Sequence, residues 1–324
     1  MTKTTSQDNE KGTIGGEKVP ILLSKRWILA YIGMVGFFFI YSLRVNLSVA
    51  IVCMVKDDVN KTTSTNLSTS NEATCTADTP SNSTNNGEFD WDKDTQSLML
   101  SAFFYGYIVL QVPGGWMAGR FGGKRVLGIG VLVTAIATVL LPVAARQDHR
   151  AVYALRVIMG LAEGVSFPCM HSMWGRWSPT MERTRLASFT YAGLNVGNVV
   201  TYIVSGLLCA YGFDNGWAAI FYLTGGAAFI WVFAWFVFVY DSPEDHPSIS
   251  QAERDYIVSH RGDKQTKKFK VPWKSVVKSR AMWMCLGAHL CNNWMHYTLL
   301  TGLPTFMKQV LKYDIKQASS EFVL

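Results

Sequence analysis

The chain has 324 residues, of which 49% are apolar and only 16% are charged, whereas an average soluble protein has about 25% charged residues. This composition excludes an intrinsically disordered chain and argues against a soluble enzyme, because the apolar residues are gathered in long runs that suit a lipid bilayer. The net charge is +7. In a membrane chain the positions of the cations matter more than their sum, and we expect no nucleic-acid partner.

About seven apolar runs are long enough to cross a bilayer, which takes about 20 helical residues. They cover residues 27–55, 97–118, 126–145, 152–175, 186–210, 217–240 and 281–306. We therefore predict an all-α membrane protein in which residues 27–240 form a six-helix bundle and residues 281–306 form a seventh helix. The other segments are an amino-terminal tail (1–26), a linker (241–280) and a second tail (307–324).

The segment 56–91 joins the first two spans and is polar over most of its length. It is rich in serine, threonine and asparagine and cannot bury enough apolar surface to order itself. Asn60, Asn66 and Asn82 each begin an Asn-X-Ser/Thr triplet, the acceptor pattern for N-linked glycans. Three such triplets in one loop predict that the loop is glycosylated and faces the lumen or the exterior.

Basic residues give an independent indication of sidedness. They precede the first span, lie between the second and third and between the fourth and fifth, and recur in the linker 241–280. All these segments are on one side if the spans alternate, so the positive-inside rule predicts a cytoplasmic amino terminus. A seven-helix receptor has the opposite orientation and is disfavoured. In the linker, Ser250 and Glu253 have capping-box spacing and predict a short amphipathic surface helix.

The six cysteines lie in or beside apolar runs, except for Cys75 in the polar loop. This distribution predicts neither a disulfide framework nor a metal site, and we expect no cofactor. Motifs for nucleotide binding, zinc proteolysis or a nucleophile elbow are missing from the sequence, so we predict that the protein is no enzyme.

Arg44 lies deep in the first apolar run. Burying a guanidinium there costs about 2.5 to 3.5 kcal/mol on insertion scales, so it needs a partner or a watery cavity. Because its planar fork can bind a carboxylate through two hydrogen bonds, Arg44 is a candidate substrate anchor. The alternative is a structural ion pair with an acidic neighbour.

Glu163 is the acidic residue deep in an apolar run. Desolvation favours the neutral form of a carboxyl, so Glu163 is a candidate to load and release a proton near neutral pH. Arg156 is seven residues away, about two turns along the same helix face, and the alternative is a static pair between the two. His171 is either a proton relay or a packing residue. The expected coupling ion is H⁺, with Na⁺ as the alternative.

Aromatic residues and glycines of the spans are further candidates for lining a cavity or packing the helices. Any of several aromatic side chains is a candidate to line a cavity or to pack the bundle: Tyr41, Phe104, Tyr105, Phe167, Tyr191, Trp294 and Tyr297. The glycines of the second and fifth spans suit close helix packing.

Residues 115–125 resemble the signature loop between the second and third helices of the major facilitator superfamily. Residues 41–50, 156–168 and 182–186 resemble, more specifically, the anion transporters that include sialin, the vesicular glutamate transporters and phosphate cotransporter-like proteins. The resemblance covers residues 27–316. It implies two bundles that rock around an anion site at the midplane, with Arg44 on the substrate carboxylate and Glu163 carrying the coupling proton.

The resemblance also implies that Tyr41, Phe167 and Tyr191 line the site. Glutamate transporters have a histidine where this chain has Leu100 and an arginine where it has Asn292. A glutamate transporter is therefore disfavoured, and Asn292 becomes a candidate substrate contact.

The resemblance favours a sialin-like, proton-coupled carrier of acidic sugars or other carboxylates, with a sodium-coupled phosphate or organic-anion carrier as the alternative. We expect a monomer in a lysosomal, vesicular or plasma membrane. Such carriers have about twelve spans in two halves, so we expect this chain to represent the first half plus one span, and not to transport by itself if it is complete.

Overall fold

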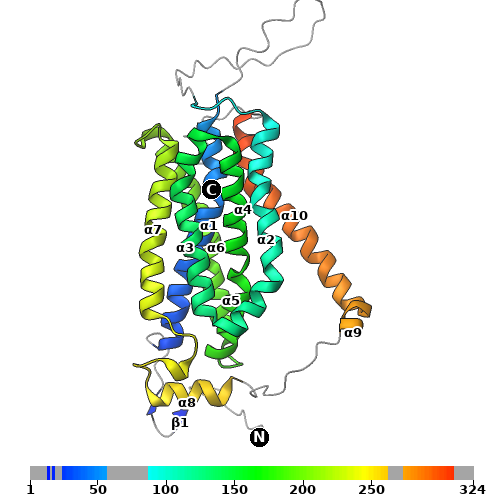
Figure 1. Ribbon diagram of the computed structural model, residues 1–324. Coiled ribbons are helices and arrows are strands. Elements are labelled where there is room, and N and C mark those ends of the chain that lie inside the picture. Colours follow the sequence, from blue (N-terminus) through cyan, green and yellow to red (C-terminus); the bar gives the residue numbers. More distant parts are fainter. Residues whose placement is uncertain (1–12, 15–16, 19–23, 57–86, 262–272, 310–324) are drawn as a thin grey trace, which may run out of the picture.

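The computed structural model describes residues 13–14, 17–18, 24–56, 87–261 and 273–309. In this part of the chain, six helical segments are long and apolar enough to span a membrane. They are α1 (Lys25–Met54), α2 (Lys93–Phe121), α3 (Gly123–Gln147), α4 (His149–Gly164) continued by α5 (Ser166–Trp177), α6 (Arg183–Tyr211) and α7 (Trp217–Phe238). They stand side by side in one bundle, which confirms the all-α fold (Figure 1). Their limits match the first six predicted spans to within about one helical turn.

The other described elements are short, except for α10. They are β1 (Thr13–Ile14), β2 (Glu17–Lys18), the 3-10 helix η1 (Pro243–Asp245), α8 (Gln251–His260), α9 (Trp273–Lys278) and α10 (Arg280–Gln309). Strands β1 and β2 form an antiparallel pair. Helix α10 occupies the predicted seventh span and is as long as α1, at 30 residues. It does not belong to the set of helices that are apolar enough to cross, so its crossing stays a prediction.

Helix α8 lies across the end of the bundle where α1 begins (Figure 1). The predicted cap of α8 is present, since the Ser250 hydroxyl accepts a hydrogen bond from the Glu253 amide at 3.3 Å. The Glu253 carboxylate is turned away from Ser250 and accepts hydrogen bonds from the amides of Lys25 and Arg26, at 3.1 and 3.2 Å. The first turn of α1 holds no acidic residue, so α8 supplies the negative charge that a helix amino terminus favours.

The fourth span is broken, although its apolar run predicted one continuous helix. Helix α4 ends at Gly164 and α5 begins at Ser166, with Val165 between them. Pro168 has no amide hydrogen to donate to the carbonyl of Gly164, four residues earlier, so the helical ladder is interrupted at this point. Glu163 therefore lies directly before a break in the helix.

Glycines bring two pairs of helices into backbone contact. A Cβ atom added at Gly193 or Gly197 of α6 would overlap backbone atoms of α1, and one added at Gly160 of α4 would overlap the carbonyl oxygen of Phe103 in α2. These contacts place α1 against α6 and α2 against α4, as the small residues of membrane helix interfaces commonly do.

We expect Gly160→Ala to lower the melting temperature of the detergent-purified chain, because a backbone carbonyl cannot rotate away from the new methyl group. Such overpacking costs about 1 to 3 kcal/mol. Gly226→Ala in α7 is the matched control, since an added Cβ there meets no atom within 4 Å. An unchanged melting temperature for Gly160→Ala would contradict the close approach of α2 and α4.

Candidate functional site

A cluster of charged side chains is buried in the middle of the bundle. Arg44 of α1, Arg156 of α4 and Glu163 of α4 are 3%, 2% and 1% exposed. Oε2 of Glu163 accepts two hydrogen bonds from Arg44, at 3.1 Å from Nε and 3.0 Å from Nη2. Nη2 of Arg156 donates to the backbone carbonyl of Arg44 at 3.1 Å. Arg44 is thus held by an acidic neighbour, and the hydrogen-bonded partner of Glu163 is Arg44 rather than Arg156.

The charges of this cluster do not balance. When all three groups are ionised, two guanidiniums face one carboxylate, which leaves one net positive charge. Within the described residues, Nε and Nη1 of Arg156 and Oε1 of Glu163 are buried without a hydrogen-bond partner. Because unpaired buried charge is costly, the cluster is suited to take up an anion.

Aromatic rings enclose the guanidinium of Arg44. The centroids of Tyr41, Tyr107 and Phe103 lie 4.5, 4.6 and 4.9 Å from its central carbon. The hydroxyl of Tyr297 in α10 accepts a hydrogen bond from Nη1 at 3.0 Å. Desolvated cation–π contacts are each worth up to about 2 kcal/mol, so the rings offset part of the cost of burial and fix the plane of the guanidinium.

Tyr41 is therefore at the cluster, whereas Tyr105 is not. Tyr105 is 57% exposed. Successive helical residues turn by about 100°, so Phe103 and Tyr107, each two positions away, face inward while Tyr105 faces outward. The structure thus does not bring Tyr105 to the cluster, and its contact with the substrate stays a prediction. Gly106 lies on the face of α2 that packs against α4, because a Cβ added there would overlap the Val157 carbonyl. Helical periodicity counted from this glycine would have identified the inward face of α2 from the sequence.

Phe167 and Tyr191 belong to a second aromatic group with Phe37, about two turns of α1 before Arg44. The ring centroids lie 4.9 to 5.6 Å apart. His171 is exposed and its ring is 5.5 Å from that of Tyr191. Among the described contacts none joins His171 to Glu163, so the geometry favours the packing alternative for His171.

Asn292 lines a cavity of about 280 Å³ between α6 and α10, with Tyr202 and His296 among the other lining residues. No described contact joins Asn292 to Arg44. The predicted glycan acceptors, Asn60, Asn66 and Asn82, lie outside the described residues. Within the described part of the chain, no group of three or more metal-binding side chains occurs.

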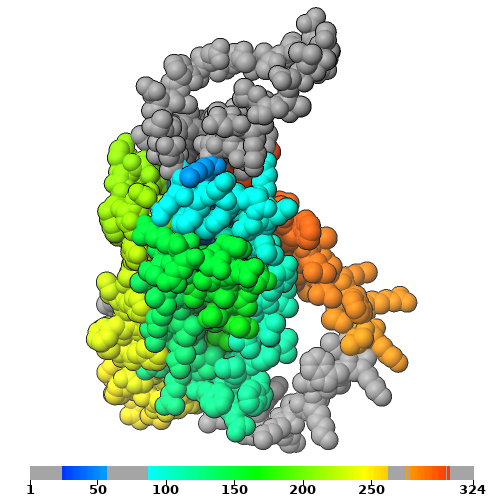
Figure 2. Space-filling model, turned by 45° about the horizontal axis from the view of Figure 1, so that its top comes forward, coloured from blue at the N-terminus to red at the C-terminus, as the bar shows by residue number. Residues whose placement is uncertain are grey.

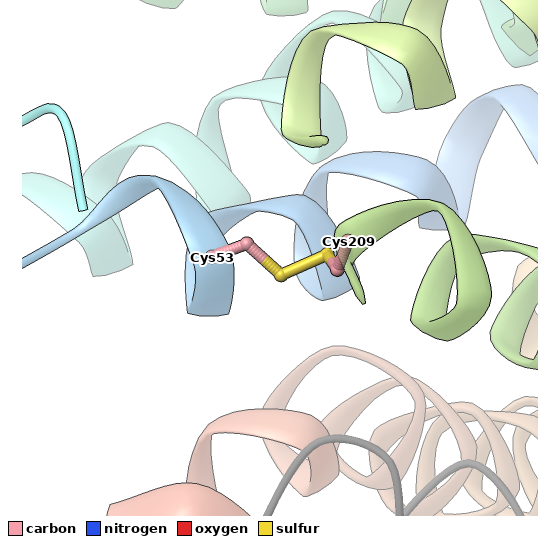
Figure 3. The surroundings of a disulfide bond; sticks show 2 residues. All are labelled: Cys53 and Cys209. Atoms are coloured by element: carbon pink, nitrogen blue, oxygen red, sulfur yellow. A yellow bond between two sulfur atoms is a disulfide. The ribbon is translucent and has the colours of Figure 1, made fainter. Parts of the chain in front are cut away.

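A disulfide joins Cys53 near the end of α1 to Cys209 near the end of α6 (Figure 3). This corrects the prediction that the cysteines form no disulfide. The two residues are 156 positions apart, and only the side-by-side packing of α1 and α6 shows that they meet. The corresponding end of the bundle is called the disulfide end below.

A polar cluster lies near the disulfide end. Glu88 accepts hydrogen bonds from Arg146 Nε, Asn215 Nδ2 and Trp217 Nε1 at 3.0 to 3.1 Å. Arg146 also donates two hydrogen bonds to Asp214. Desolvation alone would raise the pKa of Glu88, but the hydrogen bonds from its three donors outweigh it and lower that pKa below its ordinary value of 4.5. The cluster ties together the segment before α2, the last turn of α3 and the start of α7.

We expect Glu88→Gln to lower the melting temperature near neutral pH. A carboxylate with a lowered pKa in the folded state stabilises the protein above its unfolded pKa, and this contribution is lost as the pH falls below about 4.5. Melting curves at a series of pH values should therefore converge for the two proteins only in strong acid. Asp90→Asn is the control for removing a nearby exposed charge, and convergence already at mildly acidic pH would contradict the charge-assisted bonding of Glu88.

Comparisons with known proteins agree with this architecture. Residues 33–324 match the family model of the Major Facilitator Superfamily. The chain is 43% identical to sialin of Ovis aries over 302 residues, which cover 93% of this chain and 60% of that protein. It is 40% identical to a putative inorganic phosphate cotransporter of Drosophila ananassae over 278 residues, which cover 85% of this chain and 57% of that protein.

Among solved structures, the chain resembles a bacterial homolog of the human lysosomal transporter Spinster in its inward-facing, unoccupied conformation. The TM-score is 0.60 with 16% identity, over 92% of this chain and 58% of that one, a likeness that concerns the fold alone. The chain spans about three fifths of the length of the sialin it matches. It is a multi-pass membrane protein, its matched relatives are transporters rather than enzymes, and it belongs to the major facilitator superfamily.

Proposed function

We propose that this chain carries the anion-binding and proton-coupling groups of a secondary active transporter for small organic anions, such as sialic acid or other acidic sugars. The observation that carries the proposal is the buried pair of Arg44 and Glu163, with Arg156 beside it. The kinship with sialin supports a carboxylate as the substrate.

Proton and anion are coupled through one pair of hydrogen-bond donors. Glu163 occupies Nε and Nη2 of Arg44, which are the donors that a substrate carboxylate would take in a bidentate bond. Protonation of Glu163 weakens its bond and releases them. The cluster holds one net positive charge both before the exchange and after it, because a neutral glutamic acid plus a bound anion replaces the glutamate anion. The exchange therefore adds no net charge to the membrane interior.

The neighbouring residues have supporting roles in this proposal. Arg156 holds α4 against the backbone of Arg44, and the ring of Tyr41 orients the guanidinium. Phe167 and Tyr191 pack on Phe37, about two turns of α1 nearer the α8 end than Arg44.

A sodium-coupled phosphate carrier is the second candidate. It is favoured by the relative named as a putative inorganic phosphate cotransporter, and the fork of Arg44 matches a phosphate as well as a carboxylate.

The test is uptake into liposomes that contain a full-length carrier with this sequence as its amino-terminal part, because the chain is not expected to transport by itself. We expect an inward proton gradient to drive uptake of labelled sialic or glucuronic acid, Glu163→Gln to abolish the stimulation by acid, and Asp90→Asn to leave it unchanged. Uptake of labelled phosphate driven by sodium, with no response to a proton gradient, would replace the first proposal by the second.

We further propose that the α8 end of the bundle faces the cytosol and that the disulfide end faces the lumen of a lysosome or vesicle. Disulfides persist in oxidising compartments, and basic residues gather toward the α8 end, among them Arg26, Lys124 and Arg183. The sialin relative supports a lysosomal or vesicular membrane. When the plasma membrane alone is permeabilised, an antibody should reach a tag on the amino terminus, and a tag that becomes accessible only after the organelle membrane is also opened would overturn this orientation.

A further inference from the structure

The cavity between α6 and α10 is closed on one side by a contact between the helices. The hydroxyl of Tyr202 in α6 donates a hydrogen bond to the backbone carbonyl of Leu300 in α10. The remaining wall comes from α10, where Asn292 and His296 are the polar lining residues and the others are aliphatic or Met295. The cavity measures about 280 Å³, close to the lower limit for small-molecule sites.

Asn292 and His296 are one helical turn apart on the same side of α10. Both are exposed, and no described hydrogen bond involves either side chain. Neighbouring side chains such as Leu299 and Leu303 are aliphatic. Polar side chains on a helix that crosses a membrane, as α10 is predicted to do, commonly mark a site that binds something.

The cavity adjoins the anion cluster through one residue. Tyr297 follows His296 and bonds to Arg44, and the rings of His296 and Tyr297 are 5.4 Å apart. Successive residues turn by about 100° around the helix axis, so α10 presents Tyr297 to Arg44 and His296 to the cavity. Figure 2 shows the first part of α10 standing out from the bundle, and the side chains of Asn292 and His296, farther along the helix, are exposed.

We propose that His296, together with Asn292, binds the polar body of the anion whose carboxylate lies on Arg44, and so selects among carboxylates. This inference rests on the proposed function. An imidazole and an amide each offer both a donor and an acceptor, which match hydroxyl or acylamino groups rather than a second charge. The selected ligands are hydroxyl-bearing carboxylates of monosaccharide size, and a small anion such as acetate reaches Arg44 without touching His296.

The test measures ligand binding to the purified full chain and does not require transport. Ligand-induced shifts in melting temperature give the affinities for glucuronic acid and for acetate near neutral pH, where an imidazole has both a donor and an acceptor. We expect His296→Phe to weaken the binding of glucuronic acid about tenfold and to leave that of acetate unchanged. His296→Gln, which keeps a donor and an acceptor, should recover most of the loss. His289→Phe is the matched control, since it makes the same change two turns away on α10, outside the cavity.

The other outcomes separate this inference from the function on which it rests. Equal affinities of the wild type and His296→Phe for both ligands overturn the inference while leaving the anion site at Arg44 in place. If His296→Phe loses affinity for glucuronic acid and for acetate to the same extent, the inference is also overturned, because His296 would then act through the charged cluster or through the stability of the fold. If the wild type binds neither ligand, or Arg44→Gln binds both as the wild type does, the proposed function fails and the inference fails with it.

Discussion

Glu163→Gln is expected to lower the free energy of unfolding by about 3 to 5 kcal/mol, the usual cost of removing one partner of a buried ion pair. The substitution leaves the guanidiniums of Arg44 and Arg156, both almost fully buried, without a counter-charge. Arg44→Gln should cost less. Its remaining partner, Glu163, can be neutralised by a proton, whereas an arginine keeps its charge at all accessible pH values.

The decisive part of this prediction is that Glu163→Gln lowers the free energy of unfolding more than Arg44→Gln does. Denaturant unfolding of the purified proteins measures it, with Asp90→Asn as the control for the loss of an exposed acidic charge. The double variant should be more stable than the sum of the two single effects implies, since the residues share two hydrogen bonds. If Arg44→Gln is the more damaging change, the cluster does not hold the charges assigned to it.

Replacing both Cys53 and Cys209 by serine is expected to lower the stability by about 2 to 5 kcal/mol. The disulfide closes a loop of the chain that spans 156 positions and contains α2, α3, α4 and α5. The bilayer already restricts the unfolded helices, so the loss should lie in the lower part of that range.

Melting curves with and without reductant measure the effect of the disulfide. Reductant should lower the melting temperature of the wild type to that of the double variant and should leave the double variant unchanged. Cys285→Ser, at an exposed cysteine of α10, should respond to reductant as the wild type does. A wild type that is insensitive to reductant would show that the bond contributes nothing to stability.

The sequence predicted the parts of this molecule that depend on local pattern. Apolar runs located the spans, and capping-box spacing located α8. The intramembrane charges Arg44 and Glu163 were identifiable because the bilayer makes each of them costly alone.

The parts that depend on which helices are neighbours were not predictable. Helical spacing put Arg156 and Glu163 on one face, yet Glu163 bonds to Arg44 on another helix, and only tertiary packing decides this. The disulfide between Cys53 and Cys209 likewise could be predicted only by knowing that α1 and α6 are neighbours. The place of Tyr105 away from the cluster follows from the helical period alone, which turns it away from the face that carries Phe103 and Tyr107.

The pairing of Arg44 with Glu163 has a consequence for biosynthesis. Glu163 lies 119 residues after Arg44, and ribosomes add about 5 to 20 residues per second, so α1 leaves the ribosome about 6 to 24 s before its counter-ion exists. During this interval the newly made helix must be retained at the translocon or draw Arg44 toward the headgroups. Firm anchoring of α1 at the centre of the membrane therefore awaits the arrival of α4, which makes the fourth span the step that commits the nascent protein to its final arrangement.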